Sequence, residues 1–403
     1  MKLRISPFVL LCIMGGLAIF SSTMAKNPVL PLFIRALDVP MSTVGFIAAA
    51  STVVGIIVSL PAGALSDIIG RRRVILIAAV VFATAPFLYL LVSQPWHLVL
   101  VRVYHGFATA ILGPVAMAAV ADTFDTKRGE RMGWYSSATM VGRFMAPFVG
   151  GALIFGNDFR WVYIATGIIG TMALLAALRL PLSKAISDSV GGALKRGRSE
   201  IWSDIKTILT HRGILTTSAI EAVQYFAFGC LEVFLPIYLS EQARFSTLEI
   251  GSLFTIQIVA ATLTKPIMGR FSDKYGRIPV IIAGLLFGGI TMVFMTYSDN
   301  YLLLATLIGF FGLGLATVTA STSALVADLS KASSHGGALG VLSSVMDIGH
   351  STGPMIGGLL ISALNYRTAF GIVGGVLAIA SLVFGLIMRQ MPKRINSSEQ
   401  LVN

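Results

Sequence analysis

The chain has 403 residues, of which 55% are hydrophobic and only 12% are charged, and its formal net charge is +12. With a mean hydropathy of +0.83, this composition excludes a water-soluble globular protein, because no soluble fold can bury that much apolar surface. The sequence also lacks the alternating polar and apolar residues of a membrane β-barrel. We therefore predict an all-α membrane protein.

Long apolar runs follow one another along the chain, separated by short polar segments rich in Gly, Asp, Lys and Arg. Each run is long enough to cross a bilayer as a helix. The first run follows a short basic segment, as in a signal peptide, but it continues past that length and shows no clear cleavage site, so we expect a retained helix. The twelve predicted spans cover residues 7–34, 41–64, 73–93, 97–121, 132–156, 160–181, 214–240, 246–268, 278–297, 300–327, 337–363 and 367–389.

Basic residues set the expected orientation, because retained loops carry Lys and Arg mainly on the cytoplasmic side. With the N-terminus inside, twenty-two of the thirty Lys and Arg residues fall in cytoplasmic segments or at cytoplasmic span ends. We expect a multi-pass protein of the plasma (bacterial inner) membrane with both termini in the cytoplasm. This topology and anionic lipid account for the positive charge, so nucleic acid is not an expected partner. Cys12 and Cys230 both lie inside spans, which indicates neither a disulfide framework nor a thiolate metal site.

Three patterns occur twice at a nearly constant spacing, which indicates an internal duplication. The segment GALSDIIGR at 63–71 returns as GRFSDKYGR at 269–277, 206 positions later, and Asp122 matches Asp328 at the same offset. A glycine-rich pattern around Pro147 returns around Pro354, 207 positions later.

The duplication divides the chain into two similar halves. We predict a six-helix bundle at 1–181, a cytoplasmic linker at 182–213, a second six-helix bundle at 214–390 and a cytoplasmic tail at 391–403. Apolar residues at helical spacing between about 199 and 209 predict an amphipathic interfacial helix within the linker.

Over essentially its whole length the sequence resembles the major facilitator superfamily, and its motifs are closest to those of the twelve-helix drug/proton antiporters. The repeated loop motif is similar to the family signature G-x-x-x-D-x-x-G-R, and the Gly/Pro pattern of the fifth and eleventh spans resembles a motif associated with family antiporters. Arg102-Val-Tyr-His105-Gly106 resembles the R-x-x-Q-G element, with His105 where Gln is usual. The resemblance implies two pseudo-symmetric bundles that rock about a substrate held near the midplane.

The loop motif places charged side chains at a tight turn on the cytoplasmic side of each half. A carboxylate there can cap a helix N-terminus and pair with nearby arginines, and glycine lets backbones meet closely. The resemblance implies a gate that braces the two halves and breaks when this side opens; a turn that only sets topology is the alternative. The gate residues are Gly63, Asp67, Gly70, Arg71, Arg72 and Asp122, with Gly269, Asp273, Gly276 and Arg277 in the second half.

Glycines recur every four residues in the eleventh span, and the fifth span repeats the pattern with Ala146 in place of one glycine. Such stripes let another helix pack closely, and a proline bends the helix that carries it. Packing is the expected role, and the resemblance adds a rigid seam that favours exchange over leakage. The residues concerned are Gly142, Pro147, Gly150, Gly349, Gly353, Pro354 and Gly357.

Charges inside a bilayer are costly unless they face a wet cavity or a partner. The first half carries basic residues and no carboxylate within its spans, whereas the second half carries most of the acid. We favour Asp347 for proton coupling because of its depth in the span and its neighbour His350; static ion pairs are the alternative. Asp347 lies roughly opposite the glycine stripe of its helix, so it can face the central path if that stripe packs on another helix. The substrate and coupling candidates are Lys26, Asn27, Arg102, His105, Arg143, Glu221, Glu232, Asp347 and His350.

These features predict a secondary active transporter that couples protons to the efflux of a small amphiphilic or anionic organic solute. Import by proton symport or anion exchange is the alternative, and a non-transporting sensor or scaffold a remote one. Sodium coupling through Asp347 and Asn27 stays open. No P-loop, paired metal-ligand motif or G-x-S-x-G elbow is present, so we predict no enzyme, cofactor or metal. The expected partners are a small-molecule substrate, protons and membrane lipid, and the expected state is a monomer.

Overall fold

The computed structural model describes residues 6–123, 128–181, 210–330 and 335–390. The predicted linker helix and the C-terminal tail lie outside this part of the chain. Within it, helices connected by short loops make up the protein, with one isolated bridge between Phe155 and Asp158. The predicted all-α class is confirmed.

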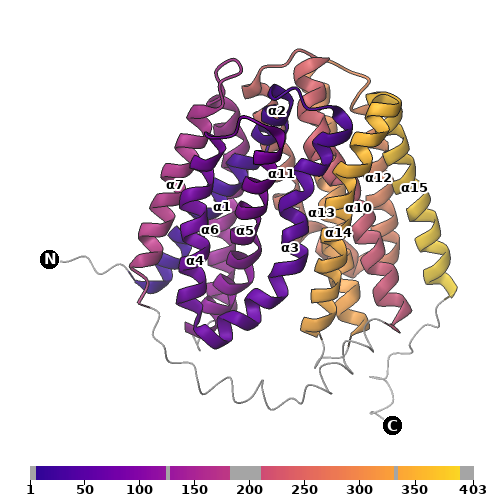
Figure 1. Ribbon diagram of the computed structural model, residues 1–403. Helices are drawn as coiled ribbons and strands as arrows, with labels where there is room; N and C mark the ends of the chain where they lie inside the picture. Colours follow the sequence, from indigo (N-terminus) through magenta and orange to yellow (C-terminus); the bar gives the residue numbers. More distant parts are fainter. Residues whose placement is uncertain (1–5, 124–127, 182–209, 331–334, 391–403) are drawn as a thin grey trace, which may run out of the picture.

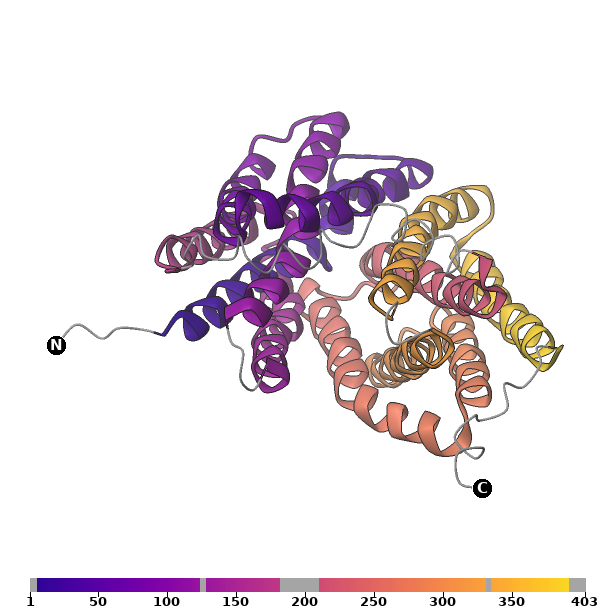
Figure 2. The same ribbon diagram turned by 90° about the horizontal axis from the view of Figure 1, so that it is seen from below.

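The helices form two bundles that lie side by side (Figures 1 and 2). The first bundle holds α1 (Pro7–Lys26), α2 (Val29–Ala36), α3 (Met41–Ile69), α4 (Arg71–Tyr89), α5 (Pro95–Thr123), α6 (Arg128–Ala152) and α7 (Arg160–Leu178). The second holds α10 (Arg212–Glu241), α11 (Thr247–Tyr275), α12 (Arg277–Phe294), α13 (Tyr301–Leu329), α14 (His335–Ala363) and α15 (Tyr366–Gln390). Because α1 and α2 together form the first span, the described helices match the twelve predicted spans.

The first span differs from the prediction in being broken. Asn27, between α1 and α2, has an extended backbone with φ −126° and ψ 123°. The next residue is Pro28, whose ring disfavours the helical conformation in the residue before it. The break therefore follows from a single proline, and it places Lys26 and Asn27 at a helix end.

The two bundles repeat each other at the level of helix boundaries. The first residues of α3 and α11 are 206 positions apart, and so are their last residues. The same holds for α5 and α13. Gly70 and Gly276 end α3 and α11 with φ of +96° and +93°. Only glycine adopts such angles without strain, which is why both copies of the loop motif need it there.

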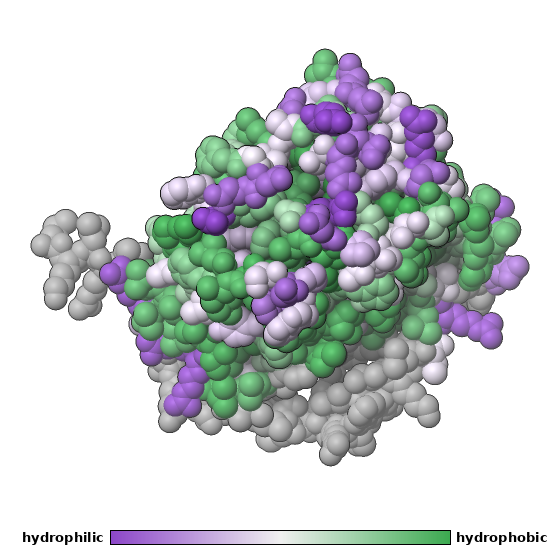
Figure 3. Space-filling view, turned by 45° about the horizontal axis from the view of Figure 1, so that its top comes forward, coloured by the Kyte–Doolittle hydropathy of each residue, from purple (hydrophilic) through white to green (hydrophobic). Residues whose placement is uncertain are grey.

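Most helices present apolar side chains to the outside, as a lipid environment requires. Among the described residues, ten segments are long and apolar enough to span a membrane, the first of them being α1 and α2 together. Helices α6 and α14 are not among the ten, since they carry glycines, serines and the charged residues Arg143 and Asp347. Figure 3 shows polar side chains gathered over the upper end of the molecule and a hydrophobic belt below it.

The bundles meet mainly through two helix pairs, α3 with α14 and α6 with α11, and α2 also contacts α10. The largest cluster of buried apolar side chains crosses this interface and contains Val29 and Ile34 of the first bundle with Phe234 and Phe254 of the second. These residues lie toward the end drawn at the top of Figure 1, where α3 begins and α14 ends. We call this end the upper end, and the end where α1 and α10 begin the lower end.

Candidate functional site

A cavity of about 600 Å³ lies between the two bundles, a volume typical of small-molecule sites. Its walls come from α1, α3, α5 and α6 on one side and α10, α11, α13 and α14 on the other. Eight of the nine candidates from the sequence line it: Lys26, Asn27, Arg102, His105, Arg143, Glu232, Asp347 and His350.

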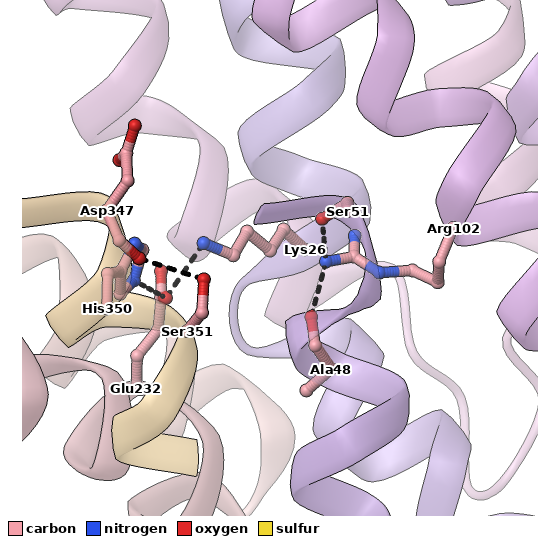
Figure 4. Close-up of polar contacts among 8 residues, drawn as sticks. All are labelled: Lys26, Ala48, Ser51, Arg102, Glu232, Asp347, His350 and Ser351. Atoms are coloured by element: carbon pink, nitrogen blue, oxygen red, sulfur yellow. Dashed lines mark hydrogen bonds and ion pairs between the residues drawn. The ribbon is translucent and has the colours of Figure 1, made fainter. Parts of the chain in front are cut away.

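Glu232 is the centre of an ion-pair cluster that joins the two bundles in this cavity. Its Oε2 atom lies 2.9 Å from Lys26 Nζ of the first bundle and 3.0 Å from His350 Nε2 of its own bundle. Figure 4 shows both side chains converging on the carboxylate. The carboxylate is only 11% exposed, so these two partners offset most of the cost of burying it.

Lys26 and Glu232 occupy equivalent positions in the two repeats, because 206 residues separate them. A twofold rotation brings equivalent residues into contact only where they lie close to the rotation axis. The ion pair therefore lies at the pseudo-symmetry axis, between the two bundles.

Arg102 does not join this cluster. Its guanidinium donates to the Ala48 carbonyl oxygen at 2.8 Å and to the Ser51 hydroxyl, both on α3, and Figure 4 shows these two contacts and none to Glu232. Arg102 is only 3% exposed. Its neighbour His105 is also buried, with Nδ1 3.4 Å from the Tyr89 hydroxyl. These two residues hold α5 to α3 and α4 within the first bundle.

Two charges of opposite sign face the cavity without a partner among the described residues. Arg143 on α6 is exposed, and no hydrogen bond or ion pair joins it to the described part of the chain. The Asp347 carboxylate on α14 is half-buried and likewise unpaired there, although its backbone oxygen accepts from Ser351. In Figure 4 this carboxylate points away from Glu232. Lys265 adds a second exposed charge to the lining.

An aromatic group forms part of the second-bundle wall. The Phe228 and His350 rings stack with centroids 5.4 Å apart and planes at 22°. The Tyr225 ring meets each of them edge-on, at 5.9 Å. Because Glu232 holds the His350 imidazole, the group is fixed by the same ion-pair cluster.

Glu221 lies elsewhere. It is 4% exposed and accepts a hydrogen bond from the Thr322 hydroxyl of α13, and it does not belong to the described lining of the cavity. The sequence placed Glu221 with the cavity candidates because it sees depth in the bilayer but not the direction in which a side chain points.

Gln257 is a cavity residue that the sequence did not single out. It is 1% exposed, and neither its amide nitrogen nor its amide oxygen has a hydrogen-bond partner among the described residues. Unpaired buried amides are costly, so a solute or water that enters the cavity has a donor and an acceptor to meet. Gln257 is equivalent to Ser51 in the first repeat, and Ser51 is a partner of Arg102. The repeat offset was therefore the sequence signal that could have pointed to Gln257.

A family model described as Major Facilitator Superfamily matches the chain twice, over residues 11–220 and 217–401. The chain belongs to the Major Facilitator Superfamily. The double match agrees with the two bundles.

Named relatives of this superfamily member cover most of its length. Multidrug resistance protein 2 of Bacillus subtilis (strain 168) is 24% identical over 355 residues, which is 87% of this chain and 88% of that protein. Quinolone resistance protein NorA of Staphylococcus aureus (strain MRSA252) is 22% identical over 379 residues, or 92% and 94%. The crystal structure of the nucleoside transporter NupG superposes with a TM-score of 0.78 at 15% identity, over 96% of this chain and all of that one. The last likeness concerns the fold alone.

The upper end of this transporter is closed by two equivalent seams. A methyl group at Gly45 of α3 would overlap the Pro354 carbonyl of α14, and one at Gly251 of α11 would overlap the Pro147 carbonyl of α6. The Thr255 hydroxyl adds a hydrogen bond of 3.1 Å from α11 to the Phe144 carbonyl of α6. Both seams need glycine because the backbones themselves touch.

The other glycines of the superfamily Gly/Pro pattern pack within each bundle. Methyl groups at Gly349 and Gly353 would overlap the α10 carbonyls of Ala222 and Phe226. In the first bundle Gly142 meets the α1 backbone at Gly16 in the same way. The remaining members follow suit, with Gly150 close to Met24 and Val29, Gly357 close to Cys230 and Phe234, and Ala146 fully buried.

The gate motif is described for the second bundle. Arg277 bridges the ends of α11 and α13, with 2.5 Å from its guanidinium to Asp273 and 3.0 Å to Asp328. Arg71 contacts the Ser66 hydroxyl in the first copy. The side chains of Asp67 and Asp122 fall outside the described part, so the expected brace between the two halves stays a prediction.

Proposed function

We propose that this transporter exports a small amphiphilic or anionic organic solute in exchange for protons, by alternating access. The observation that carries the proposal is the Lys26–Glu232 ion pair, which links the bundles at the pseudo-symmetry axis inside the cavity. The described contacts between bundles lie toward the upper end. With the lower end assigned to the cytoplasm from the distribution of Lys and Arg, we take this arrangement as the inward-facing state of the proposed cycle.

Coupling follows from what happens to Glu232 when the upper end opens. Rocking moves Lys26 away with the first bundle, while His350 stays beside the carboxylate on the second. A carboxylate without its cation is costly inside a bilayer, and binding a proton from the outside offsets that cost. When the upper end closes again, Lys26 returns and displaces the proton toward the cytoplasm.

Asp347 is the second coupling candidate, and its surroundings differ from those of Glu232. It faces the cavity with no described cation against its carboxylate, so its charge is free to respond to the substrate. The protonation of Glu232 responds to the movement of the bundles, and the protonation of Asp347 responds to the solute in the cavity. Together they make proton release depend on substrate binding.

The test is transport into proteoliposomes with an imposed pH gradient, using a panel of radiolabelled organic anions and amphiphiles. Exchange predicts accumulation in vesicles with an acidic lumen, whichever way the protein is inserted. Glu232→Gln should remove the dependence on the gradient, while Asp299→Asn, a change in an exposed loop, should keep it. Gradient-driven transport by Glu232→Gln at the rate of the unmodified protein would refute the proposed role.

Import is the second candidate, and the basic first-bundle wall favours it as much as export. Proton symport predicts the opposite sign in the same assay, with accumulation in vesicles that have an alkaline lumen. Protein-free liposomes correct for weak acids, which gather on the alkaline side unaided. The relatives named for multidrug and quinolone resistance favour export.

A further inference from the structure

The cations of the cavity are not equally available to a solute. Lys26 is held by Glu232, and Arg102 is buried and bonded to Ala48 and Ser51. Arg143 and Lys265 are exposed to the cavity, and neither has a hydrogen bond or ion pair with the described residues. Of the cavity cations described, Arg143 and Lys265 are therefore the two that can bind the anionic group of a ligand without breaking an existing contact.

Arg143 and Lys265 lie at different distances from the lower end of the protein. Arg143 is fifteen residues from the start of α6 and His350 fifteen from the start of α14, so both lie about 22 Å along their helices. Tyr225 and Phe228 are thirteen and sixteen residues into α10, which is the same depth within about 3 Å. Lys265 is ten residues from the lower end of α11, or about 15 Å. Arg143 is thus the free cation level with the aromatic group.

Arg143 and His350 are equivalent residues of the two repeats, so they lie on opposite sides of the pseudo-symmetry axis, and both line the cavity. Tyr225 lies within electrostatic range of both Arg143 and Asp347. The rings of Tyr225 and Phe228 are half-buried and line the cavity, which leaves part of each ring for a ligand to cover. The cavity thus has an aromatic wall opposite a free guanidinium.

We propose that the transported solute is a planar aromatic monocarboxylate, held by its carboxylate on Arg143 and by its ring on Tyr225 and Phe228. The inference rests on the proposed function and names its substrate class. A guanidinium binds a carboxylate through two parallel hydrogen bonds, and an aromatic ring gains from edge or offset contact with other rings. Asp347 disfavours a second carboxylate beside the rings, because like charges repel in a low-dielectric site.

Binding to the purified full chain tests this without any gradient. Isothermal titration with 2-naphthoate, its amide 2-naphthamide, cyclohexanecarboxylate and naphthalene-2,6-dicarboxylate separates the roles of charge, ring and second acid. We expect 2-naphthoate to bind most tightly. Equal affinity for 2-naphthoate and its amide would overturn the carboxylate assignment, and equal affinity for the aromatic and saturated acids would overturn the aromatic one. The dicarboxylate binding as tightly as 2-naphthoate would overturn the role of Asp347.

Variants assign the contacts. Arg143→Gln should weaken 2-naphthoate binding about 10- to 100-fold, whereas Lys265→Gln, a change at the other exposed cavity cation described, should change it less than about twofold. Arg143→Lys keeps the positive charge but not the planar guanidinium that makes two parallel hydrogen bonds, so its affinity for 2-naphthoate should lie between those of the unmodified protein and Arg143→Gln. Phe228→Leu should weaken 2-naphthoate about 2- to 10-fold and leave cyclohexanecarboxylate unchanged. Loss of binding in Lys265→Gln but not in Arg143→Gln would overturn the proposed site.

The same measurements keep this inference apart from the exchange mechanism. If 2-naphthoate binds as described but no pH gradient moves it, the exchange mechanism fails and the site stands. If a gradient drives another solute while 2-naphthoate does not bind, the site fails and the mechanism stands. A sharp thermal unfolding transition for each variant shows that the protein tested is folded.

Discussion

Arg35 and Glu241 are equivalent residues of the two repeats, 206 positions apart in the sequence, and their side chains meet with 2.7 Å between Arg35 Nε and Glu241 Oε1. The same offset relates Lys26 to Glu232, the ion pair within the cavity. Both pairs therefore lie on the pseudo-symmetry axis, one near the upper surface and one about two helical turns deeper. Two oppositely charged residues at equivalent positions attract each other across the axis, whereas two copies of the same charged residue would repel.

Reversing one charge of the surface pair should favour the state in which the upper end is open. The Arg35 and Glu241 side chains are 29% and 35% exposed, so the pair itself is worth about 0–1 kcal/mol. Arg35→Glu replaces this attraction by a repulsion of similar size, and we expect a few-fold rise in the open population. Spin labels on the exposed residues Asn157 and Asp299, one on each bundle, measure the opening.

The control is the swapped pair. Arg35→Glu combined with Glu241→Arg restores opposite charges at the same two positions, so the distance distribution should return to that of the unmodified protein. High salt should reduce the effect of the single variant, because it screens exposed charges. A double variant that stays as open as Arg35→Glu alone would contradict a role for the pair in closing the upper end.

The seams at the upper end should respond to a single methyl group. In Gly251→Ala the new Cβ meets the Pro147 carbonyl and lies 3.3 Å from the Gly151 Cα atom, and neither backbone can move as a side chain can. Overpacking of this kind costs about 1–3 kcal/mol, which is a roughly 5- to 150-fold shift toward the open state. In Gly375→Ala on α15 nothing lies within 4 Å of the added carbon, so the distance distribution between the spin labels should not change.

The two glycines of the second gate motif should differ in their effect on stability. Gly276 has φ +93° and ψ +148°, a conformation almost restricted to glycine that costs other residues about 1–3 kcal/mol, so Gly276→Ala should lower the thermal unfolding temperature. Gly269 lies within α11 with nothing within 4 Å of an added Cβ, and Gly269→Ala should be neutral or raise stability by about 0.5–1 kcal/mol. Equal destabilisation by both changes would show that packing rather than backbone conformation explains the glycine at 276.

The sequence predicted the scaffold well because its determinants are local. Span length, the loop motif and the glycine spacing each act within one or two turns of helix, and the duplication extends them to both halves. The broken first span is the exception, although Pro28 carried the signal. A proline in a long apolar run was read as part of one span, whereas its effect on Asn27 divides that span into α1 and α2.

The cavity was harder to predict, because depth in the bilayer is visible in a sequence and side-chain direction is not. Eight of the nine candidates line the cavity, yet Glu221 does not, and the sequence favoured Asp347 where the structure brings Lys26 to Glu232. The repeat offset contained that pairing. Adding the repeat offset of 206 to the residue number of Lys26 gives Glu232. Opposite charges at equivalent positions near the axis of a duplicated fold are expected to form an ion pair.

A double-mutant cycle on Lys26 and Glu232 separates the stability of the pair from its function. Glu232→Gln leaves the Lys26 ammonium without its carboxylate, and Lys26→Met leaves Glu232 with His350 alone. Each single change should lower the free energy of unfolding by about 1–3 kcal/mol, less than for a fully buried pair, because Lys26 is 29% exposed. The double variant should regain much of this loss, since removing both charges leaves neither unpaired. Proton-driven transport should not return with stability, because the double variant has no carboxylate at this position to carry a proton. Thermal unfolding and the proteoliposome assay on the same four proteins check both statements, and a double variant that couples transport to the pH gradient would transfer the coupling role to Asp347.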